Sequence, residues 1–218
     1  MRTLMVGALK GRLLGAIATG LLALPGTTQA AVVTVWDTFD GTPIEFGMQV
    51  GFGIFQGVKF VPSASGFFVG FTFGAWQMAG TDDWVFTLHS DSSGSPGSVL
   101  ETTPSIDVAP ISGTNPPGVY NGTASGATFL TAGNSYWLMA QLPSSAAGGW
   151  SQIETGIGTR AFCFTGPTCS SFTVSNDDSA GAFEVRVQTS PVPLPAAAWL
   201  LLSGLAGFGF MTRRRTAA

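Results

Sequence analysis

The chain has 218 residues and a formal net charge of −3, with 45% hydrophobic and only 10% charged residues. All twelve acidic residues but only three of the nine basic residues lie between residues 31 and 190, so that segment carries a net charge of −9. A segment with this excess of acidic residues is a poor candidate for binding nucleic acids or anionic lipids. Its 160 residues are enough for one domain with a sizeable core.

The first thirty residues have the three-part pattern of a secretory signal peptide. Arg2, Lys10 and Arg12 are basic, residues 13–24 are apolar, and small residues lead to a cleavage site after Ala30. The alternative is a permanent N-terminal anchor. It is disfavoured because twelve apolar residues are too few to span a hydrocarbon core of ~30 Å. We therefore expect residues 1–30 to direct export and to be removed.

Residues 31–190 show the two-residue period of β-strands, and no stretch before the C-terminal tail has the period of a helix. Eight weaker strands are expected among four clear ones. In the clear strands the residues expected to share one face are Phe67, Val69, Phe71, Phe73 and Ala75; Trp84, Phe86 and Leu88; Tyr136, Leu138, Ala140 and Leu142, with Trp137 and Met139 opposite; and Phe183, Val185 and Val187.

The turns between these strands are rich in Gly, Pro, Ser and Asn, as in "DSSGSPG", "TNPPG" and "AGN". Many short strands separated by such turns predict an all-β fold, an antiparallel β-sandwich of jelly-roll-like type. We expect one such domain over residues 31–190.

The only two cysteines, Cys163 and Cys169, flank a Gly-Pro turn in "CFTGPTC". In an oxidising compartment this pair predicts a disulfide that closes a hairpin loop. A redox or metal pair is the alternative. A zinc site is disfavoured because the chain has no second cysteine pair and no suitably spaced histidine.

Catalytic residues are not evident from the sequence. His89 is the only histidine, it alternates with Trp84, Phe86 and Leu88, and we expect it to face solvent or the other side of its sheet. No G-x-S-x-G motif accompanies it. We therefore assign no catalytic residue.

Acidic residues offer two further kinds of site. A glycan hydrolase needs two carboxyl groups ~5–9.5 Å apart, and Asp82 with Asp83, or Asp177 with Asp178, are candidates. Adjacent side chains on a strand point to opposite faces, so turn positions explain these pairs better. We expect no cofactor. Calcium is the alternative left open, through the loop acids Asp82, Asp83, Asp91 and Asp177, although no EF-hand-type loop is present.

Five tryptophans lie in residues 31–190, and aromatic side chains are common platforms for sugars. Most of the five are expected in the core of a sandwich. Trp76 and Trp150 border Gly-rich or polar segments, so they are the candidate ligand-facing pair.

The tail contains an uncharged run of 16 residues, 196–211, followed by Arg213, Arg214 and Arg215. As a helix the run is ~24 Å long, which is short for a bilayer but sufficient with local thinning. The arginines place the C-terminus in the cytoplasm and the body of the protein outside. A buried core helix is the alternative, and the triple arginine argues against it.

The tail resembles the PEP-CTERM sorting signal in its VPLPA form, because a short Pro motif, an apolar span and an arginine cluster follow one another. The motif residues are Val192, Pro193, Leu194, Pro195 and Ala196. The usual motif has Glu where this chain has Leu194. The resemblance implies processing by an exosortase, a membrane cysteine protease of Gram-negative bacteria that make exopolysaccharide, with the tail as a transient anchor in the inner membrane.

The stretches "FTLHSDSSGSPGSVLET" and "LTAGNSYWLMAQLP" more weakly resemble secreted choice-of-anchor β-sandwich domains, which implies a surface module without an assigned reaction. We therefore expect an exported, non-enzymatic β-sandwich protein associated with an exopolysaccharide matrix. A carbohydrate-binding module and a glycan hydrolase are the alternatives. A row of exposed aromatics would favour the first, and two carboxylates facing each other in a cleft would favour the second.

Overall fold

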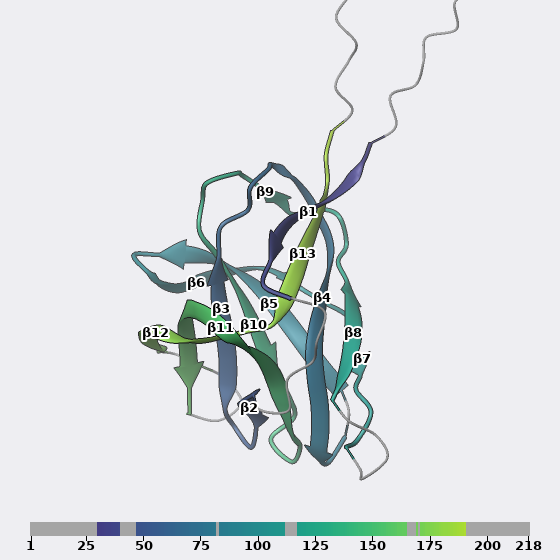
Figure 1. The fold of residues 1–218 in the computed structure, drawn as a ribbon, viewed down its shortest axis with the longest axis vertical. Helices are drawn as coiled ribbons and strands as arrows, with labels where there is room; N and C mark the ends of the chain where they lie inside the picture. Colours follow the sequence, from purple (N-terminus) through teal and green to yellow (C-terminus); the bar gives the residue numbers. More distant parts are fainter. Residues whose placement is uncertain are drawn as a thin grey trace, which may run out of the picture.

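The computed structural model describes residues 30–39, 47–81, 83–111, 117–164, 169 and 171–190 (Figure 1). These residues form β-strands and no helix, so none of them forms a helix able to cross a membrane. The predicted apolar span 196–211 lies outside them. The strands are β1 (Val32–Asp37), β2 (Gly47–Gly51), β3 (Phe55–Phe60), β4 (Gly66–Ala79), β5 (Asp83–Ser92), β6 (Ser95–Thr102), β7 (Ile106–Asp107), β8 (Gly118–Thr123), β9 (Phe129–Leu130), β10 (Tyr136–Gln141), β11 (Ala147–Cys163), β12 (Thr173–Gly181) and β13 (Phe183–Gln188).

The strands form two curled antiparallel layers, which confirms the predicted all-β antiparallel architecture. In one layer β13 and the start of β11 follow each other along one edge of β4, and β8 and β9 lie along its other edge. In the same layer β1 pairs with the other side of β13, and β2 pairs with the other side of β11. The other layer has the order β12-β11-β3-β10-β5-β6. The two layers face each other as in a β-sandwich.

Strand β11 belongs to both layers and joins them. Its first residues, from Ala147 to Trp150, pair with β4 and with β2. Its last residues, from Arg160 to Cys163, pair with β3 in the opposite layer. The hydrogen-bonded ladder is therefore continuous from β1 to β6, and the sheet folds over on itself along β11.

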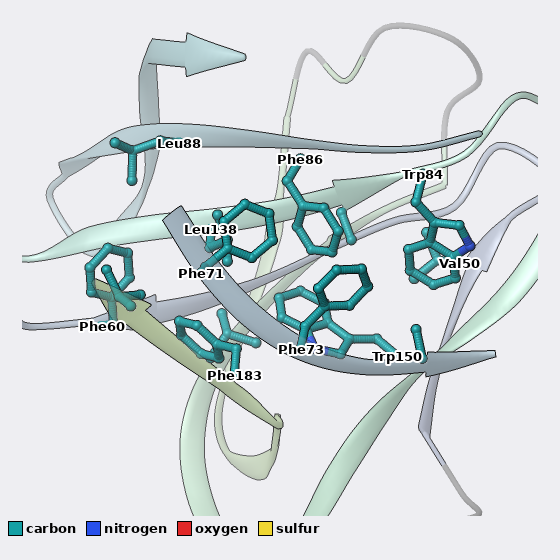
Figure 2. Packing of buried hydrophobic residues seen from close by; sticks show 14 of the residues in the cluster. Val50, Phe60, Phe71, Phe73, Trp84, Phe86, Leu88, Leu138, Trp150 and Phe183 are labelled. Carbon is teal, nitrogen blue, oxygen red and sulfur yellow. The ribbon is translucent and has the colours of Figure 1, made fainter. Parts of the chain in front are cut away.

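The core between the layers is mainly aromatic (Figure 2). Phe86 of β5 is fully buried, and its ring centroid lies 4.5 Å from that of Phe73 and 4.8 Å from that of Phe71, both on β4. Trp150 of β11 meets the same ring edge-on at 5.4 Å. Tilted and edge-on ring pairs stabilise by ~0.5–1.5 kcal/mol each beyond the burial of their area.

The predicted alternation is confirmed in three strands. The inward residues of β5 and β13 are all fully buried, and those of β10 are buried in the same core. Trp137 and Met139 point the opposite way, as expected. There they form a second, small cluster with Ala161, against which Phe172 and Val174 pack.

The predicted face of β4 is wrong at its start. Gly70 pairs with Arg186 but Phe68 pairs with Val187, so Val69 is an extra residue in a β-bulge. The bulge exchanges the two faces of the strand before it. Phe68 is therefore fully buried, whereas Phe67 is 38% exposed.

The described chain enters and leaves the fold at one end. Val32 at the start of β1 pairs with Gln188 at the end of β13, and Thr189 donates hydrogen bonds from its N and its Oγ1 to the carbonyl of Ala31, at 2.8 and 3.1 Å. We call this the terminal end (at the top of Figure 1). The opposite end, with the turn at 51–54 and the loop at 142–146, is the free end.

The sulfur atoms of Cys163 and Cys169 are bonded in the structure, and their Cα atoms lie 6.1 Å apart. Protein recovered from outside the cytoplasm should therefore show no reactive thiol until it is reduced. Maleimide labelling followed by mass spectrometry measures this. Two labels on each unreduced chain would show that the pair does not form this bond in the native protein.

The aromatic contact between the layers predicts a large stability loss when it is removed. Phe86→Ala should lower the free energy of unfolding by ~3–5 kcal/mol, because it removes a fully buried ring and leaves a cavity. Val99→Ala is a suitable control, since Val99 is 54% exposed, and should cost less than ~0.5 kcal/mol. Urea unfolding followed by tryptophan fluorescence compares the two, and equal losses would contradict this view of the core.

Candidate functional site

Two hollows that are lined by described residues lie near opposite ends of the sandwich. The first, at the free end, has a volume of about 290 Å³, and we call it the free-end pocket. The second, near the terminal end, has a volume of about 530 Å³, and we call it the terminal groove. The free-end pocket is lined by Phe55, Asp83, Val85, Gln141, Leu142, Pro143 and Ser144.

The free-end pocket is built where β3, β5 and β10 reach the same end of their layer. Val85 pairs directly with Gln141 across β5 and β10, and Phe55 begins β3 beside them. Leu142 is buried and Phe55 and Val85 are half-buried, so one side of the lining is apolar. The lining also holds a carboxylate, an amide and a hydroxyl, from Asp83, Gln141 and Ser144. A mainly apolar lining with a few polar groups is typical of sites for small ligands.

The neighbourhood of this pocket is acidic. Asp83 on β5 pairs directly with Asp107 on β7, and both side chains are exposed. Directly paired residues of antiparallel strands place their Cβ atoms ~4.5–5.5 Å apart on one face, so the two carboxylates repel each other. They lie side by side on one surface, which makes the pocket mouth negative and unfavourable for anionic ligands.

The terminal groove has an apolar side and a polar side. Its lining residues are Ser90, Asp91, Leu100, Thr128, Phe129, Gly133, Asn134, Ser135 and Tyr136. Phe129 is 49% exposed, and its ring meets that of Phe67 edge-on at 5.2 Å. This is an edge-on pair, whereas a flat platform for a sugar needs rings that lie in one plane.

Asp91 is already fully engaged within the protein. Its Oδ1 accepts a hydrogen bond from Trp137 Nε1 at 2.8 Å and lies 3.3 Å from Lys59 Nζ, and its Oδ2 accepts one from the N–H of Gly94 at 2.9 Å. Burial by itself raises the pKa of this carboxyl, but these hydrogen bonds and the charge of Lys59 outweigh it, so the pKa lies below its usual value. The role of Asp91 is therefore to join β3, β10 and the turn after β5.

His89 lies on the outer side of β5, as predicted, but it is only 8% exposed. Its two ring nitrogens lie 2.9 Å from Thr87 Oγ1 and from the carbonyl of Gly97. The ring of Phe172 meets it edge-on at 6.2 Å. Because both ring nitrogens are hydrogen-bonded to residues of β5 and β6, we assign His89 a structural role.

The prediction that Trp76 and Trp150 face a ligand is wrong, because the structure buries both indoles. Trp76 is 7% exposed and Trp150 is not exposed at all, and Trp150 Nε1 donates to the carbonyl of Ala182 at 3.1 Å. The glycines beside them make room for the rings. A Cβ on Gly149 would lie 2.0 Å from the Trp76 ring, and one on Gly181 would lie 2.6 Å from the Trp150 ring. These glycines mark close packing within strands.

The acids proposed for calcium do not come together. Asp83 and Asp91 lie eight residues apart on β5, which is ~26 Å along a strand, so they cannot bind the same ion. Asp82 and the side chain of Asp177 lie outside the described residues. Among the residues that the structure describes, no three His, Cys, Asp or Glu side chains gather as metal ligands would.

The remaining predicted residues belong to the two ends of the chain. The sorting motif from Val192 to Ala196 and the arginines Arg213, Arg214 and Arg215 lie outside the described residues. Ala30, the predicted last residue of the signal peptide, directly precedes Ala31, which binds Thr189. The sequence patterns did not predict the free-end pocket, although Gln141, a polar residue that ends the apolar run of β10, is a signal of it.

Comparison with known proteins adds no relative. No family model matches the chain, and no curated protein sequence matches it. The proposals below therefore depend on the chain itself.

The contacts of Asp91 predict a pH-dependent loss of stability. Asp91→Asn replaces an acceptor of the Gly94 N–H by an amide and removes the ion pair with Lys59, so at pH 7 it should cost ~1–3 kcal/mol. Because the folded-state pKa is depressed, the contribution of the carboxylate is complete above its unfolded-state pKa of ~3.9. It is lost as the pH falls through the lower folded-state value.

The difference in unfolding free energy between the parent and this variant should therefore stay constant from pH 8 to about pH 5 and should shrink below about pH 4. Urea unfolding at a series of pH values measures it. Asp107→Asn is the control, because it removes one charge from an exposed site and should change stability by less than ~0.5 kcal/mol. A difference that grows on acidification would contradict the role given to Asp91.

Proposed function

We propose that this chain is an exported, non-enzymatic β-sandwich protein of a Gram-negative bacterium. An exosortase-type membrane protease sorts it to the cell surface or the medium, where it associates with exopolysaccharide. The observation that carries the proposal is the pairing of β1 with β13, closed by the hydrogen bonds from Thr189 to Ala31. Both targeting segments join the domain at its terminal end, and the rest of the sandwich extends away from them.

The positions at which the fold begins and ends support this assignment. Cleavage after Ala30 removes no strand residue, since β1 begins at Val32. The motif that starts at Val192 follows the last residue of β13, Gln188, by a few positions. Cleavage at either segment therefore leaves the sandwich intact. For the detailed strand arrangement of this sandwich we propose a jelly roll.

In this proposal the tail acts as a transient anchor in the inner membrane. Residues 196–211 cross the bilayer as a single helix, and Arg213, Arg214 and Arg215 remain on the cytoplasmic side. Each arginine costs ~2.5–3.5 kcal/mol at the centre of a bilayer on the insertion scale. Passage of all three is prohibitive, so the Pro193 and Pro195 motif is held just outside the membrane, within reach of the protease.

A carbohydrate-binding module is the second candidate, and the amphipathic lining of the free-end pocket favours it. A glycan hydrolase has less support. Asp83 lines that pocket while its neighbour Asp107 does not, so the two acids do not face each other across the pocket. The proposal therefore assigns no reaction to the chain.

Two tail variants test the sorting proposal in the native bacterium. In Pro193→Ala with Pro195→Ala, full-length protein should accumulate in the inner membrane, because the motif that the protease reads is lost. In the triple Arg213→Ala, Arg214→Ala, Arg215→Ala variant, uncut protein should pass through or insert wrongly, because the stop is lost. Immunoblots of membrane, surface and medium fractions measure the size and the place of the protein.

Ser190→Ala is the control, because Ser190 is exposed and lies between β13 and the motif, and this variant should mature as the parent does. If both tail variants also mature and leave the membrane like the parent, the anchor-and-cleave proposal is refuted.

A further inference from the structure

The turn between β2 and β3 holds a large aromatic residue in a conformation that does not suit it. Gly51 and Ile54 exchange hydrogen bonds at 3.0 and 2.9 Å, and the two residues between them, Phe52 and Gly53, have φ angles of +50° and +83°. Two consecutive positive φ angles define a type I′ turn, in which Asn-Gly is the preferred pair. A bulky residue at positive φ is a true outlier and is strained.

Burial does not explain the choice of Phe52, because its side chain is 57% exposed. The turn after β5 has the same backbone conformation as the turn at Phe52. There Ser93 and Gly94 have φ angles of +53° and +86°, so a small polar residue adopts the same conformation. The fold therefore does not need an aromatic ring at the tip of such a hairpin, and strained residues of this kind gather at functional sites.

The turn that carries Phe52 is bonded to the loop that contributes to the free-end pocket. Its N–H donates to the carbonyl of Ala146 at 2.9 Å, which fixes the turn against the loop at 142–146. Leu142, Pro143 and Ser144 of that loop line the pocket. The backbone therefore ties the turn that carries the exposed Phe52 ring to a loop that lines the pocket.

We propose that Phe52 and the free-end pocket together form a binding site for a neutral polysaccharide. The C–H groups on one face of a sugar ring are attracted to the negative face of an aromatic ring. The hydroxyl groups of the sugar need donors and acceptors, and Gln141, Ser144 and Asp83 offer an amide, a hydroxyl and a carboxylate. This inference rests on the proposed association with exopolysaccharide and names the site that carries it out.

Size and charge select this ligand among the alternatives. The pocket volume of about 290 Å³ is at the small end of the ~300–1,000 Å³ range of ligand sites, which suits one sugar ring better than a strand or helix of a partner protein. Asp83 and its neighbour Asp107 make the mouth negative, and the domain has a charge of −9. A polymer of uronic acids is therefore repelled, whereas an uncharged polysaccharide is not.

Binding is tested with the purified full-length chain in mild detergent, so that the result does not depend on whether the tail is processed. Affinity electrophoresis measures the retardation by dextran, galactomannan, hydroxyethyl cellulose and alginate. At least one of the three neutral polymers should retard the parent protein, and alginate should not. Phe52→Asn should weaken that binding at least tenfold.

The same variant separates binding from folding. Because Asn favours this turn, Phe52→Asn should leave the melting temperature unchanged or raise it. Phe129→Asn is the matched control, since Phe129 is an exposed phenylalanine at the other end of the sandwich, and it should bind as the parent does. Gln141→Ala provides a second variant within the pocket and should weaken binding several-fold with the fold retained.

Three results would overturn this site: no retardation by any neutral polymer, retardation by alginate alone, or parental binding by both Phe52→Asn and Gln141→Ala. A lower melting temperature for Phe52→Asn would show that the ring has a structural role. Sorting is measured separately in cells. A chain that binds but is not processed refutes only the sorting proposal, and one that is processed but does not bind refutes only this site.

Discussion

The contact between Phe73 and Phe86 is the constraint on which the rest of the structure depends. The two rings lie 4.5 Å apart and come from β4 and β5, which belong to opposite layers. Phe71 and Trp150 close around the same pair, and Phe183 joins it through Trp150 (Figure 2). Because these rings fill the space between the layers, the free-end pocket and the terminal groove lie outside that space, near the ends of the sandwich.

The layer that contains β10 is covered on both of its faces. Lys59, Trp137 and His89 form one row across β3, β10 and β5 on its outer side. The Lys59 ammonium lies 5.9 Å from the centre of the Trp137 ring, and Phe172 packs on His89. The outer face of this layer, which a simple sandwich exposes to water, therefore carries a lysine beside buried aromatic side chains. This explains why β10 has apolar residues at successive positions.

The sequence was most informative where strands are regular. Two-residue alternation predicted the faces of β5, β10 and β13, because one side of each strand faces the aromatic core. It failed at the start of β4, since a bulge at Val69 is decided by the partner strand β13 and leaves no local signature. It also failed for Trp76 and Trp150. Glycine next to an indole predicted a loop, but here it provides space for the ring within a strand.

The free-end pocket could be predicted only in part for a related reason. Its lining comes from β3, β5, the end of β10 and the residues that follow it, which meet only after the register of three strands is fixed. The turn at Phe52 was within reach, because a Gly-Phe-Gly sequence between two strands suggests positive φ angles. What the sequence alone does not contain is the hydrogen bond from Phe52 to Ala146, which joins that turn to the loop that lines the pocket.

The position of β13 has a mechanical consequence. This strand is hydrogen-bonded on both sides, to β1 and to β4, and it leads directly into the C-terminal tail. A force applied between the tail and the free end of the sandwich acts along β13 and loads the bonds of both ladders in shear. Strands loaded in this way must break many bonds at once, whereas strands pulled apart sideways lose them one after another. The fold therefore resists traction along the direction in which an anchored chain would experience it.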